Sequence, residues 1–185
     1  MFSIDNFIED CRTAVSGTDP HQAVQALVER AVSDPTGLMA GLGEPKRAGV
    51  NKLYVSDDLT VLNLIWGPQM ILMPHNHEMW AAIGIYTGRE DNMFWRRLPE
   101  DENGKLKAAG ARSLEPSDVA ALGSDAIHSV YNPLMRLTGA LHVYGGNFFE
   151  TPRSEWDPEN LHEGTYDVAK NLQLFEDSNS RLESA

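Results

Sequence analysis

Residues 73–88 read M-P-H-N-H-E-M-W-A-A-I-G-I-Y-T-G, with two histidines, His75 and His77, beside an apolar run. Residues i and i+2 of a β-strand point to the same face of a sheet. The spacing therefore predicts that both imidazoles can reach one point, as two ligands of a metal ion must. An isolated His-x-His is equally typical of two histidines at the solvent-exposed end of a strand, so the interpretation depends on the rest of the chain.

From Lys52 onward the sequence has the pattern of short strands separated by turns. Glycine, proline and asparagine mark the turns at Gly67-Pro68, Gly88, Asn103-Gly104, Gly123, Asn132-Pro133 and Gly145-Gly146. The predicted strands are 53–56, 60–66, 70–77, 80–87, 92–98, 111–114, 119–122, 127–131 and 137–144. Many short strands at such spacing predict an all-β sandwich or barrel, here over residues 50–150.

Helices are predicted at both ends of the chain. Residues 3–32 show two amphipathic helical patterns, the first with Ser3 as N-cap and the second with Pro20 at its first position, within a helical N-terminal segment of residues 1–45. Residues 37–49 are rich in glycine and predict a loop. A C-terminal extension, residues 151–185, is expected to hold one more helix after Gly164. The whole chain, 1–185, is expected to form a single domain.

Composition excludes several classes of function. The 185 residues carry 15 Lys and Arg against 27 Asp and Glu, a net charge of −12, which argues against sequence-independent binding to nucleic-acid phosphates or to anionic membranes. The single cysteine, Cys11, cannot form an intrachain disulfide. No basic leader and no apolar run long enough for a membrane span are present. A cytoplasmic protein is the expectation.

The chain has four more histidines, at positions 21, 128, 142 and 162. His128 follows a glycine-containing turn and begins an apolar segment, and His142 lies in the segment Ala-Leu-His-Val-Tyr. Each can be either a metal-site residue or a hydrogen-bonded core histidine. His21 and His162 lie in polar surroundings and are expected to be solvated.

The spacing of the histidines resembles the first of the two cupin motifs. Gly67, His75-x-His77 and Gly88 match its pattern, whereas Ala81 stands where most cupins have a metal-binding glutamate. Residues 118–132 resemble the second motif through His128 and Asn132, although Gly123 and Asp125 replace its usual proline and glycine. The resemblance covers about half of the chain. It implies a jelly-roll β-barrel with a metal held by His75, His77 and His128.

Within the cupins, the sequence resembles the thiol dioxygenases, whose best-known member is cysteine dioxygenase. These enzymes hold iron with three histidines and no carboxylate. The sequence matches their Trp-Gly at Trp66-Gly67, and His75-x-His77-x-x-Trp80 looks like the bacterial branch. The match to their Ser-x-His-x-Tyr element implies that His142 orients Tyr144, whose hydroxyl would bond the oxygen or the substrate. The resemblance implies Fe(II) as cofactor, O₂ and a small thiol as substrates, and a sulfinic acid as product.

Three positions depart from that family. Ala140 replaces the serine of the Ser-x-His-x-Tyr element, and Ala81 excludes the Cys-Tyr crosslink of mammalian members. Ser56 stands where cysteine dioxygenase has the arginine that binds the substrate carboxylate, and a hydroxyl does not replace a bidentate guanidinium. A mercapto-carboxylic acid is therefore a better expectation than cysteine. The candidates for a substitute cation are Arg89, Arg96, Arg97, Arg136 and Arg153, with Arg96 and Arg97 expected at the surface.

Two alternatives stay open on the sequence. Imidazole ligands also suit Zn, Ni, Cu or Mn, so the same histidines can serve another metal-dependent cupin enzyme with a non-thiol substrate. A cupin that binds a small ligand without turnover is the second alternative. Cupin edge strands often pair, and a homodimer is an expectation by analogy alone.

Overall fold

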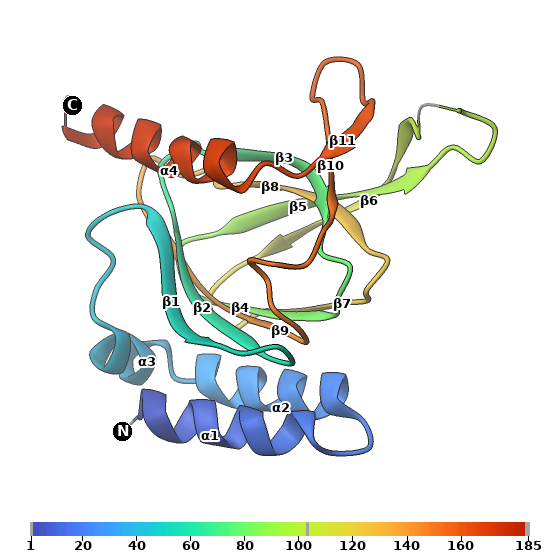
Figure 1. Ribbon diagram of the computed structural model, residues 1–185. Coiled ribbons are helices and arrows are strands. Elements are labelled where there is room, and N and C mark those ends of the chain that lie inside the picture. Colours follow the sequence, from blue (N-terminus) through green and yellow to red (C-terminus); the bar gives the residue numbers. More distant parts are fainter. Residues whose placement is uncertain (1, 103, 184–185) are drawn as a thin grey trace.

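The computed structural model describes residues 2–102 and 104–183. Asn103 of one predicted turn, and residues 1, 184 and 185 of the expected single domain, lie outside the described residues. Two antiparallel sheets face each other (Figure 1). One has the strand order β1-β2-β9-β4-β7 and the other β11-β10-β3-β8-β5-β6. The predicted all-β jelly roll with a helical N-terminal segment is thus confirmed.

The first sheet contains β1 (Gly49–Val55), β2 (Thr60–Trp66), β4 (Ala81–Thr87), β7 (Val119–Leu122) and β9 (Thr138–Tyr144). The second contains β3 (Ile71–Asn76), β5 (Glu90–Arg97), β6 (Leu106–Leu114), β8 (Ile127–Tyr131), β10 (Ser154–Trp156) and β11 (Glu163–Thr165). Alternate residues of β4, among them Ala81, Ile83 and Ile85, belong to the core between the sheets.

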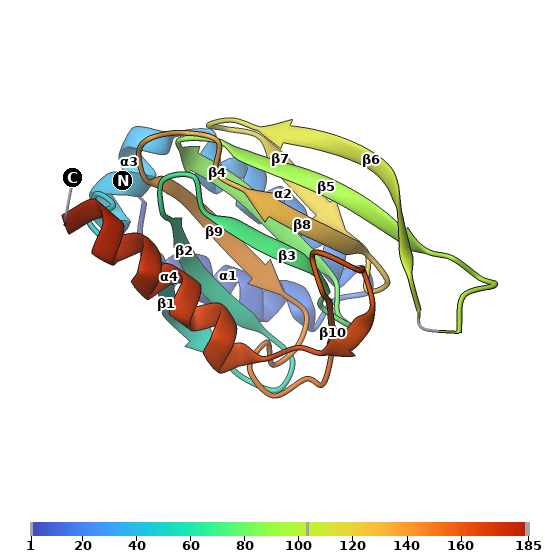
Figure 2. The same cartoon turned by 90° about the horizontal axis from the view of Figure 1, so that it is seen from above.

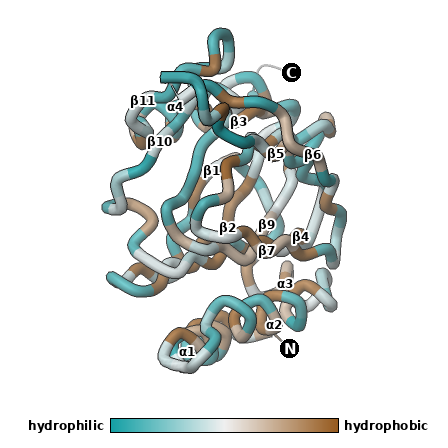
Figure 3. Tube along the Cα trace, turned by 90° about the vertical axis from the view of Figure 1, so that its right-hand side faces the viewer, coloured by the Kyte–Doolittle hydropathy of each residue, from teal (hydrophilic) through white to brown (hydrophobic). Residues whose placement is uncertain are grey.

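Three helices, α1 (Ile4–Val15), α2 (Pro20–Val32) and α3 (Pro35–Leu42), cover the outer face of the first sheet (Figures 1 and 3). Their N-caps follow the sequence signals, since the Ser3 side chain accepts the Asn6 amide and Pro20 stands in the first turn of α2. Val28 and Val32 of α2 press so closely on Gly84 of β4 that a Cβ there would lie 2.6–2.7 Å from their methyl groups. Glycine at this position lets the helix layer approach the sheet.

The prediction that residues 37–49 form a loop is wrong at its N-terminal end, because α3 extends to Leu42. Asp34 caps this helix by accepting the Gly37 amide, and Pro35 stands in its first turn. Phe2 packs against Gly41, so the glycine that suggested a loop is a close contact instead. The strands β10 and β11 were not predicted.

The C-terminal helix α4 (Val168–Glu183), predicted after Gly164, lies on the side of the molecule opposite to α1–α3 (Figures 2 and 3). Phe175 stacks on Trp66 with ring centroids 5.5 Å apart. The Asn179 side chain makes two hydrogen bonds with the backbone of Ala48, at 2.8 and 3.0 Å. These contacts fix α4 over the opening between the two sheets. Among residues 2–102 and 104–183, no helix combines the length and the apolar character needed to cross a membrane.

Candidate metal centre

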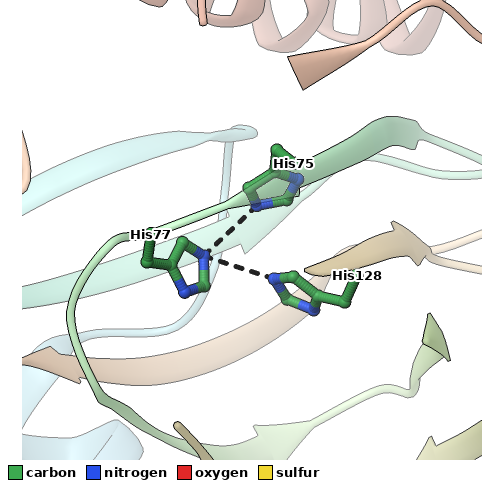
Figure 4. Close-up of side chains that lie close together, drawn as sticks. All are labelled: His75, His77 and His128. Carbon is green, nitrogen blue, oxygen red and sulfur yellow. Dashed lines mark hydrogen bonds between the residues drawn. The ribbon is translucent and has the colours of Figure 1, made fainter. Parts of the chain in front are cut away.

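Neighbouring strands bring the three motif histidines together. His75 lies on β3 directly opposite His128 on β8 in the antiparallel register, and His77 follows the end of β3. Glu78 then adopts a left-handed backbone conformation (φ 56°) and accepts a hydrogen bond from the Asn76 side chain at 2.6 Å. This turn directs His77 back toward the other two rings (Figure 4).

The three imidazoles meet at their Nε2 atoms. His77 Nε2 lies 3.3 Å from His75 Nε2 and 3.3 Å from His128 Nε2. All three side chains are buried, and each offers a ligand atom within 4.8 Å of the other two. The residues that the motif resemblance implies as ligands are therefore in one place.

The hydrogen bonds of the outer ring nitrogens show that this place suits a cation. His75 Nδ1 lies 2.9 Å from the Met73 carbonyl, and His128 Nδ1 lies 2.7 Å from the Asn92 side-chain oxygen. Both oxygens only accept, so both Nδ1 atoms carry the proton and both Nε2 atoms present a lone pair. A neutral His77 has at most one proton on Nε2, whereas that atom faces the lone pairs of two nitrogens, His75 Nε2 and His128 Nε2. Hydrogen bonds alone therefore cannot satisfy all three atoms. A divalent metal satisfies all three Nε2 atoms at once, with the outer partners fixing the rings of His75 and His128 as in known metal sites.

Burial keeps the three rings neutral. It lowers the pKa of His75 to about 4, with the nearby Arg153 charge adding to the effect. Burial also lowers the pKa of His77 and of His128 well below 6.5, and repulsion between the histidines lowers both further. Neutral imidazole is the form that binds metals, so the site is ready to bind at neutral pH.

The same shifts predict that acid destabilises the metal-free protein. The unfolded chain binds a proton at each histidine near pH 6.5, whereas the folded chain binds it at His75 only near pH 4, so folding stability falls as the pH drops through this window. His75 alone contributes about 3 kcal/mol at the acid end. Denaturant melts of the metal-free protein between pH 7 and pH 4 measure the slope, which should be shallower in the His75→Gln variant. An equal slope in that variant would contradict the assignment.

Tyr144 and His142 lie beside the cluster, on β9. The Tyr144 ring is 5.1 Å from the His77 ring, and its hydroxyl is hydrogen-bonded to His142 Nδ1 at 2.9 Å. Burial raises the pKa of Tyr144 above its ordinary value, so the hydroxyl keeps its proton. The structure thus places the two residues together, with Tyr144 nearer to the three histidines.

Glu90, on β5, is a buried carboxylate that sequence reasoning missed. It accepts hydrogen bonds from Trp66 Nε1 at 2.7 Å and from Asn92 Nδ2 at 3.0 Å. His142 Nε2 lies 3.6 Å from the carboxylate. Burial raises the pKa of Glu90, but the contacts with His142, Asn92 and Trp66 lower it by more than burial raises it. The pKa of Glu90 is therefore below its ordinary value. A charged residue at the start of a strand gives no sequence signal of such burial.

Among the five candidate cations, Arg153 is the one whose charge acts on His75 and His77. Its side chain is 7% exposed, and the guanidinium stacks between the rings of Phe148 and Tyr166, 4.2 Å from each centroid. Nη1 donates to the Phe148 and Thr151 carbonyls. Nε and Nη2 are buried and have no hydrogen-bond partner among the described residues.

The other candidate cations lie elsewhere. Arg89 pairs with Asp91 and Arg97 with Glu163. Arg96, Arg97 and Arg136 are exposed. The expectation that Arg96 and Arg97 lie at the surface is thus confirmed. Ser56 lies in the turn between β1 and β2, where its hydroxyl bonds Asp58 and the Leu59 carbonyl.

An apolar pocket opens onto the three histidines and Tyr144. Its remaining wall consists of Val50, Leu64, Trp66, Leu72, Val130, His142, Phe148, Phe149, Tyr166, Val168, Asn171, Leu172 and Phe175. Asn171 is one of the polar residues of this wall: its amide nitrogen donates to Glu155 at 2.7 Å, whereas its oxygen is buried without a partner among the described residues. The helix α4 supplies one side of this pocket.

The two remaining histidines lie outside the site. His162 is exposed, as expected. The expectation that His21 is solvated is wrong, because its ring stacks on Trp80 (5.2 Å) and its Nε2 lies 3.2 Å from the Ala81 carbonyl. The α2 start packs on the sheet here, which the polar local sequence does not reveal.

No model of a known protein family matches the sequence. Solved structures with a similar fold include a tryptophan-to-tyrosine variant of oxalate decarboxylase from Bacillus subtilis (17% identity, TM-score 0.42, 56% of this chain and 27% of that one). A deletion variant of the same enzyme gives a TM-score of 0.44 at 17% identity and covers 58% and 28%. A third, described with Mn(II) centres, gives 0.42 at 16% identity and covers 55% and 26%. The match spans little more than a quarter of these enzymes.

Proposed function

We propose that this protein is a metal-dependent cupin enzyme of the thiol dioxygenase type, which oxidises a small thiol to a sulfinic acid with O₂. The observation that carries the proposal is the Tyr144 hydroxyl, hydrogen-bonded to His142 and next to the three converging histidines in an apolar pocket. His75, His77 and His128 are the proposed metal ligands, and Fe(II) is the proposed metal. The reaction balances as R–SH plus O₂ giving R–SO₂H, so both oxygen atoms enter the product.

Iron held by His75, His77 and His128 would supply the redox chemistry that activates O₂ toward a thiol sulfur. Three neutral imidazoles add no negative charge, so they favour an anionic thiol sulfur as a further ligand. The aromatic and aliphatic wall limits water around the reacting atoms. Tyr144, which stays protonated because burial raises its pKa, can hydrogen-bond an oxygen or sulfur atom beside His77.

Arg153 supports an acidic thiol as substrate. A carboxylate binds the guanidinium best through two parallel N–H bonds, and Nε and Nη2 form such an edge. These are the two nitrogens that lack a protein partner in the described residues. Stacking between Phe148, which lines the pocket, and Tyr166 holds the edge in place. A mercapto-carboxylic acid such as 3-mercaptopropionate therefore suits the site better than a thiol without a carboxylate.

The test is metal analysis followed by O₂ uptake. We expect iron in protein purified without added metal, and O₂ consumption by the iron-loaded protein that is fastest with 3-mercaptopropionate, slower with cysteine and slowest with cysteamine. Mass spectrometry should show the sulfinic acid. Iron-loaded protein that consumes no O₂ with any of the three thiols would contradict the dioxygenase proposal.

A second candidate shares the same site. Arg153 recognises a carboxylate whether or not the molecule carries sulfur, so a cupin that uses Mn, Zn or Ni on a non-thiol carboxylic acid also fits the donor set. The solved oxalate decarboxylase described with Mn(II) centres is a cupin of that kind. Manganese, zinc or nickel in the purified protein, with no thiol-dependent O₂ uptake, would favour this candidate. Protein that binds no metal would leave a ligand-binding cupin.

A further inference from the structure

The buried carboxylate of Glu90 is linked through Asn92 to the metal-site histidine His128 and lies beside His142, the partner of Tyr144. Its side chain is fully buried on β5, yet it carries a charge. Burying an isolated carboxylate lowers the stability of the folded protein. Removing one partner of a buried charge is strongly destabilising, because the charge is then left uncompensated. The contacts that offset this cost run to Trp66, Asn92 and His142.

The first arm of this network leads to His128. The Asn92 amide nitrogen donates to Glu90 at 3.0 Å, which turns the amide oxygen toward His128. That oxygen accepts from His128 Nδ1 at 2.7 Å and so leaves Nε2 free as a ligand. Without an acceptor at Glu90 the Asn92 amide can rotate, and its NH₂ group would then oppose the N–H of His128.

The second arm leads to Tyr144. His142 Nε2 lies 3.6 Å from Glu90, and His142 Nδ1 bonds the Tyr144 hydroxyl at 2.9 Å. Residue 140, which shares the β9 face with His142, is alanine and offers no polar group to this ring. Glu90 approaches the same imidazole from β5 instead. His142 Nε2 has no hydrogen-bond partner among the described residues, and it faces the Glu90 carboxylate at 3.6 Å.

We propose that Glu90 is a positioning residue that orients the metal ligand His128 through Asn92 and the Tyr144 hydroxyl through His142. The inference rests on the proposed function, because it assumes that His128 binds a metal. One carboxylate then sets both the direction of a ligand lone pair and the position of the hydroxyl that faces the substrate. Loss of its charge should weaken metal binding and disturb the site geometry together.

Cobalt titration tests this proposal without relying on turnover. Metal-free wild type and Glu90→Gln protein are titrated with Co(II), whose visible absorption reports ligand number and geometry. A glutamine presents its NH₂ group to one of the two donors, Trp66 or Asn92, so we expect about 10–100-fold weaker Co(II) binding and an altered spectrum. The control variant is Asp91→Asn. It changes the adjacent carboxylate, which pairs with Arg89, and this variant should bind Co(II) as wild type does.

A double mutant separates positioning from general loosening of the fold. If Glu90 acts on His128 through Asn92, then Glu90→Gln adds little further loss of Co(II) affinity to Asn92→Ala. Additive losses, or wild-type affinity and spectrum in Glu90→Gln, would overturn the proposal. If Glu90→Gln does not fold, Asn92→Ala tests the first arm by itself, and unchanged Co(II) affinity there would overturn it. Absence of Co(II) binding in wild type would refute the proposed function instead.

Discussion

Replacing His75 with alanine is expected to abolish stoichiometric metal binding and to lower thiol-dependent O₂ uptake by at least about 100-fold, since even residues that only support a ligand change metal affinity by 10–100-fold. His75 supplies one of three converging Nε2 atoms and pairs directly with His128 across β3 and β8. Two remaining imidazoles cannot hold a divalent ion in a defined geometry. Metal content after dialysis, measured by elemental analysis, checks this outcome.

The fold should survive this change. His75 is one side chain at the end of a barrel whose core has many other contributors, so the circular dichroism spectrum of metal-free His75→Ala should match that of wild type. His162→Ala is the matched control, because His162 is exposed and is not one of the three converging histidines. Full metal loading in His75→Ala, or loss of metal in His162→Ala, would refute the assignment of the ligands.

The strands that were predicted best are those whose local sequence carries the whole signal. The predictions 60–66, 119–122 and 127–131 coincide with β2, β7 and β8, because turn residues bound each apolar run. The strand β6 begins at Leu106, whereas the prediction began at residue 111. The prediction missed the first residues because β6 is an edge strand with seven exposed residues, so its sequence shows no alternation of burial. The strands β10 and β11 have three residues each and pair with one another along their whole length, and β10 joins the sheet through Glu155 opposite His75, so neither has a local signal of its own.

The site divides in the same way between local and tertiary information. The two-residue spacing of His75 and His77 is a local signal, and the resemblance to a second motif added His128. Glu90 was beyond reach, and Arg153 was one of five candidate cations that the sequence could not rank, because a buried charge is recognisable only once its partners are known. Glu90 is stabilised by groups from β2, β5 and β9, and Arg153 by the rings of Phe148 and Tyr166.

Replacing Arg153 with leucine is expected to lower kcat/KM for 3-mercaptopropionate by about 30-fold or more, because truncating one partner of a buried, hydrogen-bonded charge pair costs roughly 2–5 kcal/mol. The Arg153→Lys variant keeps the charge but loses the edge formed by Nε and Nη2, so its loss should be intermediate. Turnover of cysteamine, which has no carboxylate, should change little in either variant. Steady-state O₂ uptake with both thiols measures the split.

Two comparisons separate substrate binding from damage to the site. Arg153 is not among the three converging histidines, so metal content should stay at the wild-type level in both variants. Arg96→Leu removes an exposed arginine on β5 and is the matched control for the change in charge. An equal loss for 3-mercaptopropionate and cysteamine would show that Arg153 supports the pocket without binding the carboxylate. A selective loss for the acid would identify the group that takes over from the arginine missing at Ser56, and with it the class of thiol that this barrel accepts.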